Sequence, residues 1–181
     1  FKMKNILKII GVLVLAFVGY VAYMIINPVS PKETVTYNSE ISDFEVVYSR
    51  PYKKDRLIFG AAEDGALVPF RNYWRTGANA ATTFETSNEI MFDNQRVKPG
   101  KYRLYTIPNI NDWKVVLNLE ADKLFAISEP DYSKDIVTIK VPSNSNLEEI
   151  VEQFTIDFST DSLGVNMNLK WDRTSISIPI K

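Results

Sequence analysis

The sequence contains no cysteine and no histidine among its 181 residues. Without cysteine the chain has no disulfide, no thiolate nucleophile and no iron–sulfur ligand. Without histidine it lacks the commonest general base, the Ser-His-Asp triad, and imidazole ligands for zinc or haem. Catalysis would have to use carboxylates, lysine, tyrosine or arginine. We therefore assign no catalytic residue, expect no metal and no cofactor, and favour a non-catalytic role.

An excess of positive charge is also missing, and the charges are divided unevenly along the chain. The formal net charge is −1, but Lys2, Lys4 and Lys8 precede an apolar segment and all 22 acidic residues follow it. The rest of the chain therefore carries 18 basic and 22 acidic residues, a net charge of −4. Such a domain has no electrostatic footprint for nucleic acid, so we expect no nucleic-acid partner.

A run of 18 uncharged residues, from Ile9 to Ile26, stands near the N-terminus, and apolar character begins at Ile6. A helix starting at Ile6 would be about 31 Å long, which matches the hydrocarbon core of a bilayer. One alternative is a cleaved signal peptide, but bulky residues from Tyr23 onward occupy the positions where a peptidase needs small ones. The other is a buried helix of a soluble domain. We predict a cytoplasmic stub and a transmembrane helix within residues 1–27.

The lysines predict the orientation of this helix. Three lysines precede it, and only Lys32, beside Glu33, follows within a dozen residues. The positive-inside rule then places the N-terminus in the cytoplasm and the rest of the chain in the periplasm, with the helix in the lipid bilayer of a bacterial inner membrane.

Small residues predict a packing face on the helix. At about 100° per residue, Gly11, Gly19 and Ala22 fall within one arc of about 80°. Small residues let another helix approach closely, so this face is expected to contact integral membrane subunits of a larger complex. The alternative is that glycine and alanine are simply common in transmembrane helices.

The remaining sequence predicts one β domain. Residues 28–40 contain two prolines followed by Thr, Ser and Asn, and are expected to be a linker. From residue 41 to residue 181, apolar and polar residues alternate with a period of two, for example at Phe154, Ile156 and Phe158 and at Met167, Leu169 and Trp171. Many short strands of this kind predict a mainly β fold, an antiparallel β-sandwich. Further strands are expected at 44–49, 56–60, 72–76, 82–86, 89–93, 102–107 and 113–119, and a helical turn at 147–149.

Short motifs run in a fixed order through this domain. The most specific is Trp74-Arg75-Thr76-Gly77-Ala78-Asn79. The others are Tyr48-Ser-Arg50-Pro51, Arg56-Leu-Ile-Phe-Gly60, Leu67-Val-Pro69-Phe70, Pro99-Gly100-Lys-Tyr102, Trp113-Lys-Val-Val-Leu-Asn118 and Leu169-Lys-Trp171. Together they resemble the DUF2911 family, a domain of unknown function common in Bacteroidetes. The resemblance covers residues 44–180 and implies the source and the fold, but no activity.

The same motifs contain the candidate ligand-binding residues Arg50, Arg75 and Asn79. Arg75 offers a rigid fork of donors for a carboxylate, a phosphate or a sugar. Gly77 permits a close approach of the backbone, and Asn79 tolerates a left-handed turn. In the alternative interpretation Trp74 belongs to the core and Arg75 pairs with an acid. The basic run at 50–56 is either a surface for an anionic glycan, lipid head group or partner, or a solvated turn.

A possible modification site lies in Asp161-Ser162-Leu163, which resembles a short signal for O-glycosylation in Bacteroidetes. Ser162 falls between two predicted strands, where a glycan would meet no obstacle. The alternative is an ordinary hairpin turn in which Asp161 caps the backbone and Gly164 supplies the bend.

Two functions from different classes follow from these patterns. The first is a single-pass, membrane-anchored accessory or interaction subunit of a larger bacterial membrane protein complex. The second is a cell-envelope glycan-binding protein or a carboxylate-dependent hydrolase that uses Arg75, Asn79 and carboxylates. The absence of histidine and cysteine favours the first, and the chains that surround the helix would distinguish the two.

Overall fold

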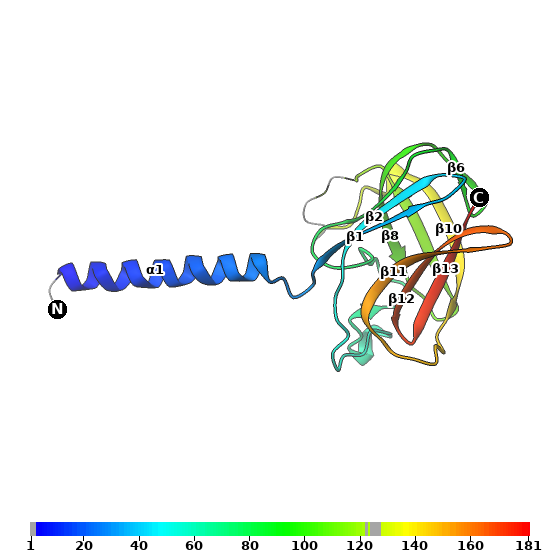
Figure 1. Cartoon of the computed structure of the whole chain (residues 1–181). Coiled ribbons are helices and arrows are strands. Elements are labelled where there is room, and N and C mark those ends of the chain that lie inside the picture. The colour runs from blue at the N-terminus through cyan, green and yellow to red at the C-terminus, as the bar shows by residue number, and fades with distance from the viewer. Residues whose placement is uncertain (1–2, 122, 124–127) are drawn as a thin grey trace.

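The computed structural model describes residues 3–121, 123 and 128–181, which form one α-helix followed by a β domain (Figure 1). Helix α1 (Met3–Ile26) stands apart from the β domain, on the side away from the C-terminus. Within the described residues, no helix combines the length and the apolar character that a membrane crossing requires. The other elements are β1 (Lys32–Asn38), β2 (Asp43–Ser49), β3 (Phe59–Gly60), η1 (Ala62–Asp64), β4 (Val68–Pro69), β5 (Thr82–Thr86), β6 (Ile90–Phe92), β7 (Gln95–Val97), β8 (Gly100–Ile107), β9 (Asp112–Asn118), η2 (Tyr132–Lys134), β10 (Asp135–Asn144), β11 (Val151–Asp161), β12 (Gly164–Asp172) and β13 (Thr174–Ile180).

Eleven strands form a single antiparallel sheet, which confirms the prediction of a mainly β, antiparallel domain. The order of strands is β1-β2-β5-β8-β9-β10-β13-β12-β11, and the short strands β6 and β7 attach beside β13. The only parallel pair among the described residues is β3 with β4, two residues long. The fold therefore consists of one strongly curved, nearly closed sheet.

Strand β10 explains why one sheet forms instead of the predicted two-sheet sandwich. Its residues 135–142 pair with β9, and its last two residues, Ser143 and Asn144, pair with β13. A strand that passes from one half of a domain to the other makes a corner and joins both halves. The alternation in the sequence predicts which face of β10 is buried, but it carries no information about this change of partner.

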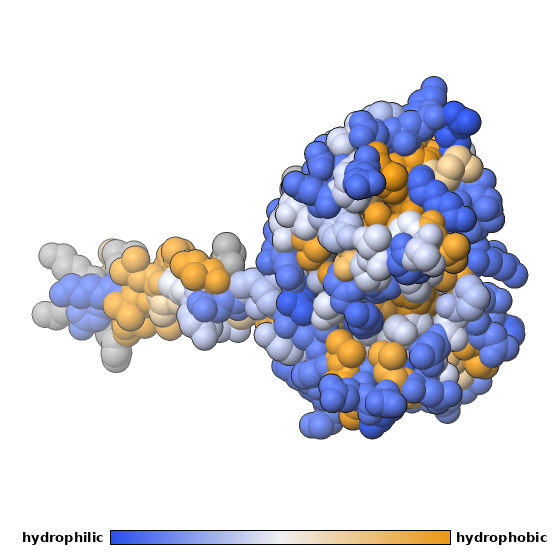
Figure 2. Space-filling view, turned by 45° about the vertical axis from the view of Figure 1, so that its right-hand side comes forward, coloured by the Kyte–Doolittle hydropathy of each residue, from blue (hydrophilic) through white to orange (hydrophobic). Residues whose placement is uncertain are grey.

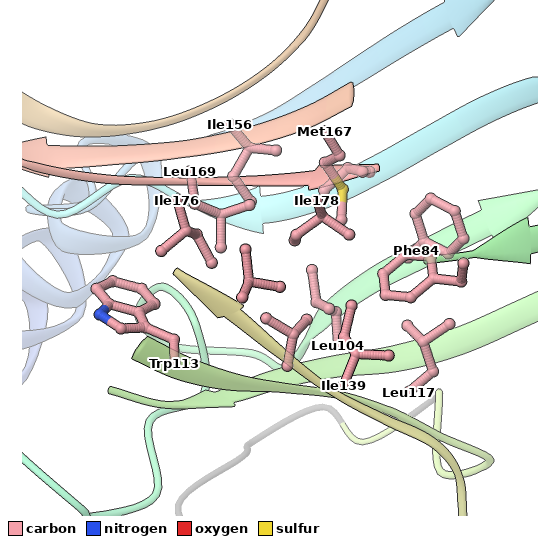
Figure 3. Close-up of a cluster of buried hydrophobic side chains, with 14 of the residues drawn as sticks. Phe84, Leu104, Trp113, Leu117, Ile139, Ile156, Met167, Leu169, Ile176 and Ile178 are labelled. Atoms are coloured by element: carbon pink, nitrogen blue, oxygen red, sulfur yellow. The ribbon is translucent and has the colours of Figure 1, made fainter. Parts of the chain in front are cut away.

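The core lies between the two halves of the curved sheet. Figure 3 shows Ile156, Leu169 and Ile178 pointing toward Leu104 and Ile139 from the opposite half. The residues predicted for the core are Phe154, Ile156, Phe158, Met167, Leu169 and Trp171. The prediction is confirmed: five of them are buried, and the partly buried Phe158 packs against the core.

Aromatic rings fill the end of the core that lies under the 74–79 motif. Trp74 stacks on Trp171 with ring centroids 5.8 Å apart, and its ring meets Phe154 edge-on at 4.9 Å. Phe59 packs against Trp113 at 4.9 Å. Aromatic pairs in these geometries add to the stability that burial alone provides. Trp74 is thus a core residue, as the alternative interpretation of its motif predicts.

The open side of the sheet is bridged by a seam, defined here as the contacts of residues 48–53, at and after the end of β2, with residues 152–156 of β11. Arg50 is its centre. The Nε atom of Arg50 donates to the carbonyl oxygen of Phe154 at 3.0 Å, and Nη2 donates to Thr155 Oγ1 at 2.8 Å. Nη1 forms an ion pair of 2.6 Å with Glu33 on β1. One guanidinium group therefore connects β1, the end of β2 and β11.

Backbone and tyrosine contacts extend the seam on both sides of Arg50. The Phe154 amide donates to the carbonyl oxygen of Pro51 at 2.9 Å, and the Ile156 amide donates to the Tyr48 hydroxyl at 2.9 Å. Farther along, the ring of Tyr37 stacks on Phe158 with centroids 5.3 Å apart. These contacts give backbone groups on the free edge of β11 partners and make the sheet nearly closed.

Three segments differ from the sequence-based expectation. Strand β1 lies inside the predicted linker 28–40 and pairs with β2 over its whole length, because β-forming residues follow the two prolines. The predicted strand 72–76 is an irregular segment with a single bridge between Trp74 and Thr106. No helical turn forms at 147–149. In each case contacts with distant parts of the chain decide the local structure.

We expect Arg50→Met to lower the free energy of unfolding by about 2–4 kcal/mol, because it removes charge-assisted hydrogen bonds and leaves a backbone acceptor in the seam unpaired. Chemical unfolding followed by tryptophan fluorescence measures this loss. Arg96→Met is the matched control, since Arg96 pairs with Glu89 on the exposed surface, where ion pairs contribute at most about 1 kcal/mol. Equal effects of the two substitutions would contradict the role of Arg50.

The stability of the domain should fall in alkaline solution because of Tyr48. Burial is the main cause that raises the pKa of the Tyr48 hydroxyl to about 12. The unfolded state releases this proton near pH 10, whereas the folded state retains it, so unfolding becomes more favourable as the pH rises from about 10 to about 12.

The loss due to Tyr48 is about 1.4 kcal/mol per pH unit in this window. Tyr48→Phe should flatten the dependence of the unfolding free energy on pH by about one proton. Unfolding curves at several alkaline pH values give both slopes. Identical slopes for the variant and the unsubstituted protein would show that Tyr48 does not cause the loss.

Candidate functional site

A cavity of about 520 Å³ opens beside the segment that connects α1 to β1, and it is called the basic cavity below. Residues 51–56 contribute one wall, and the corner formed by residues 74–79 contributes the other. Trp74 and Trp171, both part of the core, lie at its base, and Val29 and Ser30 line it beside the helix. Its volume is in the range typical of sites for small molecules.

The 74–79 corner has an unusual backbone that several hydrogen bonds hold in place. Thr76, Gly77 and Asn79 have φ angles of 56°, 146° and 59°. A Cβ atom on Gly77 would lie 2.9 Å from the carbonyl oxygen of Ser49, so only glycine fits there. Thr82 Oγ1 donates to the carbonyl oxygen of Thr76 at 2.6 Å, and Trp74 Nε1 donates to that of Gly77 at 3.2 Å. The corner is therefore rigid.

The corner presents Arg75 and Asn79 to the basic cavity. Arg75 Nη1 donates to the carbonyl oxygen of Asn79 at 3.1 Å, and Asn79 Nδ2 donates to the carbonyl oxygen of Ser30 at 3.2 Å. In the alternative interpretation of the sequence Arg75 pairs with an acid, but among the described residues no acid pairs with it. The corner positions the guanidinium group, and within residues 3–121, 123 and 128–181 its other N–H donors have no protein acceptor.

Two further cations come from the opposite wall. Lys54 has a φ angle of 50°, and its amide donates to Glu152 Oε1 at 2.8 Å, while its side chain is exposed. Arg56 Nε donates to the carbonyl oxygen of Lys53 at 3.1 Å, and its Nη2 donates to that of Tyr52. Both Lys54 and Arg56 line the basic cavity. The basic run seen in the sequence thus folds so that part of it faces Arg75.

Among the residues that the structure describes, no acidic residue lines the basic cavity. The cavity can accept a ligand rich in hydrogen-bond acceptors, because two arginines, a lysine and an asparagine line it. It offers no pair of carboxylates of the kind that glycoside hydrolysis requires. In the described part of the chain, no group of three acidic residues is arranged to hold a metal ion.

Arg50, the third candidate for ligand binding, lies outside the basic cavity. Its guanidinium group is engaged by Phe154, Thr155 and Glu33 in the seam. Arg50 supports the cavity indirectly, since its backbone precedes the wall formed by residues 51–56.

The candidate packing residues of α1 have open surroundings in the single chain. A Cβ atom added to Gly11 or Gly19 would meet no atom within 4 Å, and Ala22 is exposed. Contact with another helix at this face therefore stays a prediction.

Ser162 lies in the exposed turn between β11 and β12. Asp161 Oδ1 accepts from the amide of Leu163 at 2.7 Å, Oδ2 accepts from Asn166 Nδ2 at 2.8 Å, and Gly164 has a φ angle of 140°. These hydrogen bonds, with that from Leu163 first, lower the pKa of Asp161. The turn has the geometry of the hairpin alternative, and glycosylation of Ser162 stays a prediction.

Sequence reasoning missed a buried polar cluster on the outer face of the sheet. Arg103 on β8 is 1% exposed, lies over the ring of Tyr73 at 5.5 Å and forms a long ion pair of 3.8 Å with Glu120. The hydrogen bond from the Asp131 amide, followed by that from Lys134, lowers the pKa of Glu120. An arginine at an outward position of an alternating strand is expected to be exposed, because nothing in the local sequence shows that Glu120 and Ser128, which follow β9, contact it.

The comparisons with known proteins identify a family. Curated proteins and solved structures give no significant match. The family model described as a protein of unknown function, DUF2911, matches residues 30–180. This match includes both walls of the basic cavity and every strand of the domain, so the resemblance in the sequence motifs is confirmed. The chain belongs to the DUF2911 family.

Proposed function

We propose that the chain is a single-pass, membrane-anchored accessory subunit of a larger bacterial membrane protein complex, with its β domain in the periplasm. The observation that carries this proposal is the uncovered helix. Val12, Leu13, Leu15 and Phe17 are each between 63% and 73% exposed. Figure 2 shows hydrophobic residues along the described part of α1, whereas the visible face of the β domain is mainly hydrophilic.

An uncovered apolar helix of this kind requires an apolar environment. Burying one large apolar side chain stabilises a protein by about 1.5–3 kcal/mol, so a row of them in water is strongly unfavourable. The β domain does not cover α1, because the helix stands away from it (Figure 1). The hydrophobic core of the domain includes no residue of α1. A bilayer, or a group of helices within one, provides the missing contacts.

The length and the charges of the complete segment support the bilayer. The described residues of α1 do not by themselves qualify as a span, so the proposal rests on the full sequence. Residues 9–26 are uncharged, and the 24 residues of α1 extend over about 36 Å, compared with about 30 Å for a hydrocarbon core. Lys2, Lys4 and Lys8 favour a cytoplasmic N-terminus.

The basic cavity favours a second candidate function, a cell-envelope glycan-binding protein, over a hydrolase. Arginine and asparagine side chains are suitable partners for sugar hydroxyl and acidic groups. The alternative of a carboxylate-dependent hydrolase has no support at this cavity, since no described residue of its lining is Asp or Glu.

We expect the full chain to remain with membranes during extraction with alkaline carbonate. The double substitution Leu13→Arg and Phe17→Arg should move most of it to the soluble fraction, because each arginine at the centre of a span costs about 3 kcal/mol. Sedimentation and immunoblotting measure the two fractions, and protease added to spheroplasts should digest the β domain.

The matched control for this experiment is Ile110→Arg with Ile150→Arg, which changes two exposed apolar residues of the β domain. It should leave the membrane fraction unchanged. Release of the unsubstituted chain by carbonate would reject the anchor, and full protection of the β domain in spheroplasts would reverse the orientation.

A second prediction concerns the small-residue face of α1. Gly11→Leu should weaken the association of the chain with its partner helix, because the added side chain separates the two backbones. Crosslinking in native membranes measures this association. Val14→Leu, a conservative change in the same helix, is the control. Undiminished crosslinking of the Gly11 variant would show that this face does not contact protein.

A further inference from the structure

We infer that the basic cavity binds a phosphate ester, with its phosphate group held by Arg75, Lys54 and Arg56. Three cationic residues line this cavity, and in the described part of the chain no Asp or Glu does. They converge although the chain that follows the helix carries four more acidic than basic residues. The positive charge is therefore a local property of the two walls that form the cavity.

Arg75 is the residue best prepared to hold the phosphate. The carbonyl oxygen of Asn79 accepts from Nη1 at 3.1 Å and fixes the direction of the side chain. In the described part of the chain its remaining donors have no protein acceptor. A guanidinium group fixed in this way offers two parallel N–H donors, the geometry that suits a phosphate.

The opposite wall adds the positive charge of Lys54, whose backbone has an unfavourable conformation. Lys54, Gly77 and Asn79 all line the cavity and all have positive φ angles. For a residue such as lysine this conformation costs about 1–2 kcal/mol. The seam holds Lys54 in place, because Glu152 accepts from its amide at 2.8 Å. Strained residues of this kind gather at sites where they position side chains for a ligand.

The rest of the lining indicates that the ligand is an ester instead of the free ion. Tyr52 and Leu67 line the cavity and are 39% and 43% exposed, so they provide apolar contacts beyond the cations. The amide oxygen of Asn79 is an acceptor that can receive a hydroxyl group, since Nδ2 already donates to Ser30. A phosphate attached to a short hydroxylated or apolar group would satisfy all of these contacts.

The position of the cavity bears on the source of that phosphate. Val29 and Ser30 line it, and the four residues that follow Ile26, up to Ser30, span at most about 14 Å. If α1 is the membrane anchor proposed above, the cavity lies at the depth of the lipid head groups. Binding of a phosphate group by the cavity does not depend on the membrane anchor. A lipid can supply that phosphate only if the anchor proposal is correct.

The test titrates glycerol phosphate into the full chain in detergent micelles and in nanodiscs of neutral lipid. Tryptophan fluorescence is the readout, because Trp74 and Trp171 line the cavity. We expect a saturable change, and at least a tenfold loss of affinity in the double variant Lys54→Gln and Arg75→Gln. Arg96→Gln with Lys140→Gln removes the same charge away from the cavity and should change the affinity less than twofold.

A second arm distinguishes the two sources of the phosphate. Nanodiscs that contain phosphatidylglycerol should alter the fluorescence of the unsubstituted chain and prevent the response to glycerol phosphate if a lipid head group is the ligand. An unchanged response in these nanodiscs identifies a soluble phosphate ester. Either result supports the site, provided that the response is lost in the Lys54→Gln and Arg75→Gln variant and kept in the Arg96→Gln and Lys140→Gln variant.

The inference is overturned if neither probe changes the fluorescence, or if both double variants lose binding equally, since that would indicate a general charge effect. Arg75→Lys guards against a folding defect: it keeps the charge, and should bind more weakly than the unsubstituted chain with the same melting temperature. Binding that depends on Arg75 in a chain released by carbonate would support the cavity while rejecting the anchor.

Discussion

The closure of the sheet by Arg50 is the interaction on which the rest of the domain depends. A sheet of this length has two edges, and unpaired edge strands expose donors and acceptors that must find partners. The single guanidinium group reaches Glu33 on β1 and the backbone of β11 at Phe154, and so joins the two ends of the sheet. The same closure fixes residues 51–56, which form one wall of the basic cavity. Opening of the seam would separate β11 from the end of β2 and displace the 51–56 wall of the cavity.

Core and cavity also share their aromatic residues. Trp74 and Trp171 stack on each other in the core, and both lie at the base of the cavity. The 74–79 corner begins at Trp74, so the position of Arg75 follows directly from the packing of a large buried ring. A side chain attached in this way to the core moves little, and a site that is already ordered loses less free energy on binding.

The sequence predicts the parts of this structure that depend on local patterns. The alternation at Phe154–Phe158 and Met167–Trp171 identifies buried faces, and the residue types of Gly77 and Asn79 suit the conformations that they adopt. Local patterns of this kind do not reveal contacts between residues that are distant in the sequence. Arg50 looks like a surface cation until β11 lies against it, and β1 looks like a linker until β2 pairs with it. The sequence identifies Arg75, Asn79 and the basic run 50–56 as candidates, but it does not show that they line one cavity, because contacts between distant parts of the chain bring the two walls together.

The short connection between α1 and β1 has a mechanical consequence. Five residues separate the two elements, and the last of them are tied down by Arg50, whose amide donates to Pro31, and by Asn79, which donates to Ser30. The interstrand hydrogen bonds of β1 are perpendicular to the strand. A force that pulls the helix along the direction of β1 would therefore load all seven pairs of the β1–β2 ladder in shear instead of opening them one by one. The domain is attached to its helix in a way that resists traction and transmits it to the sheet.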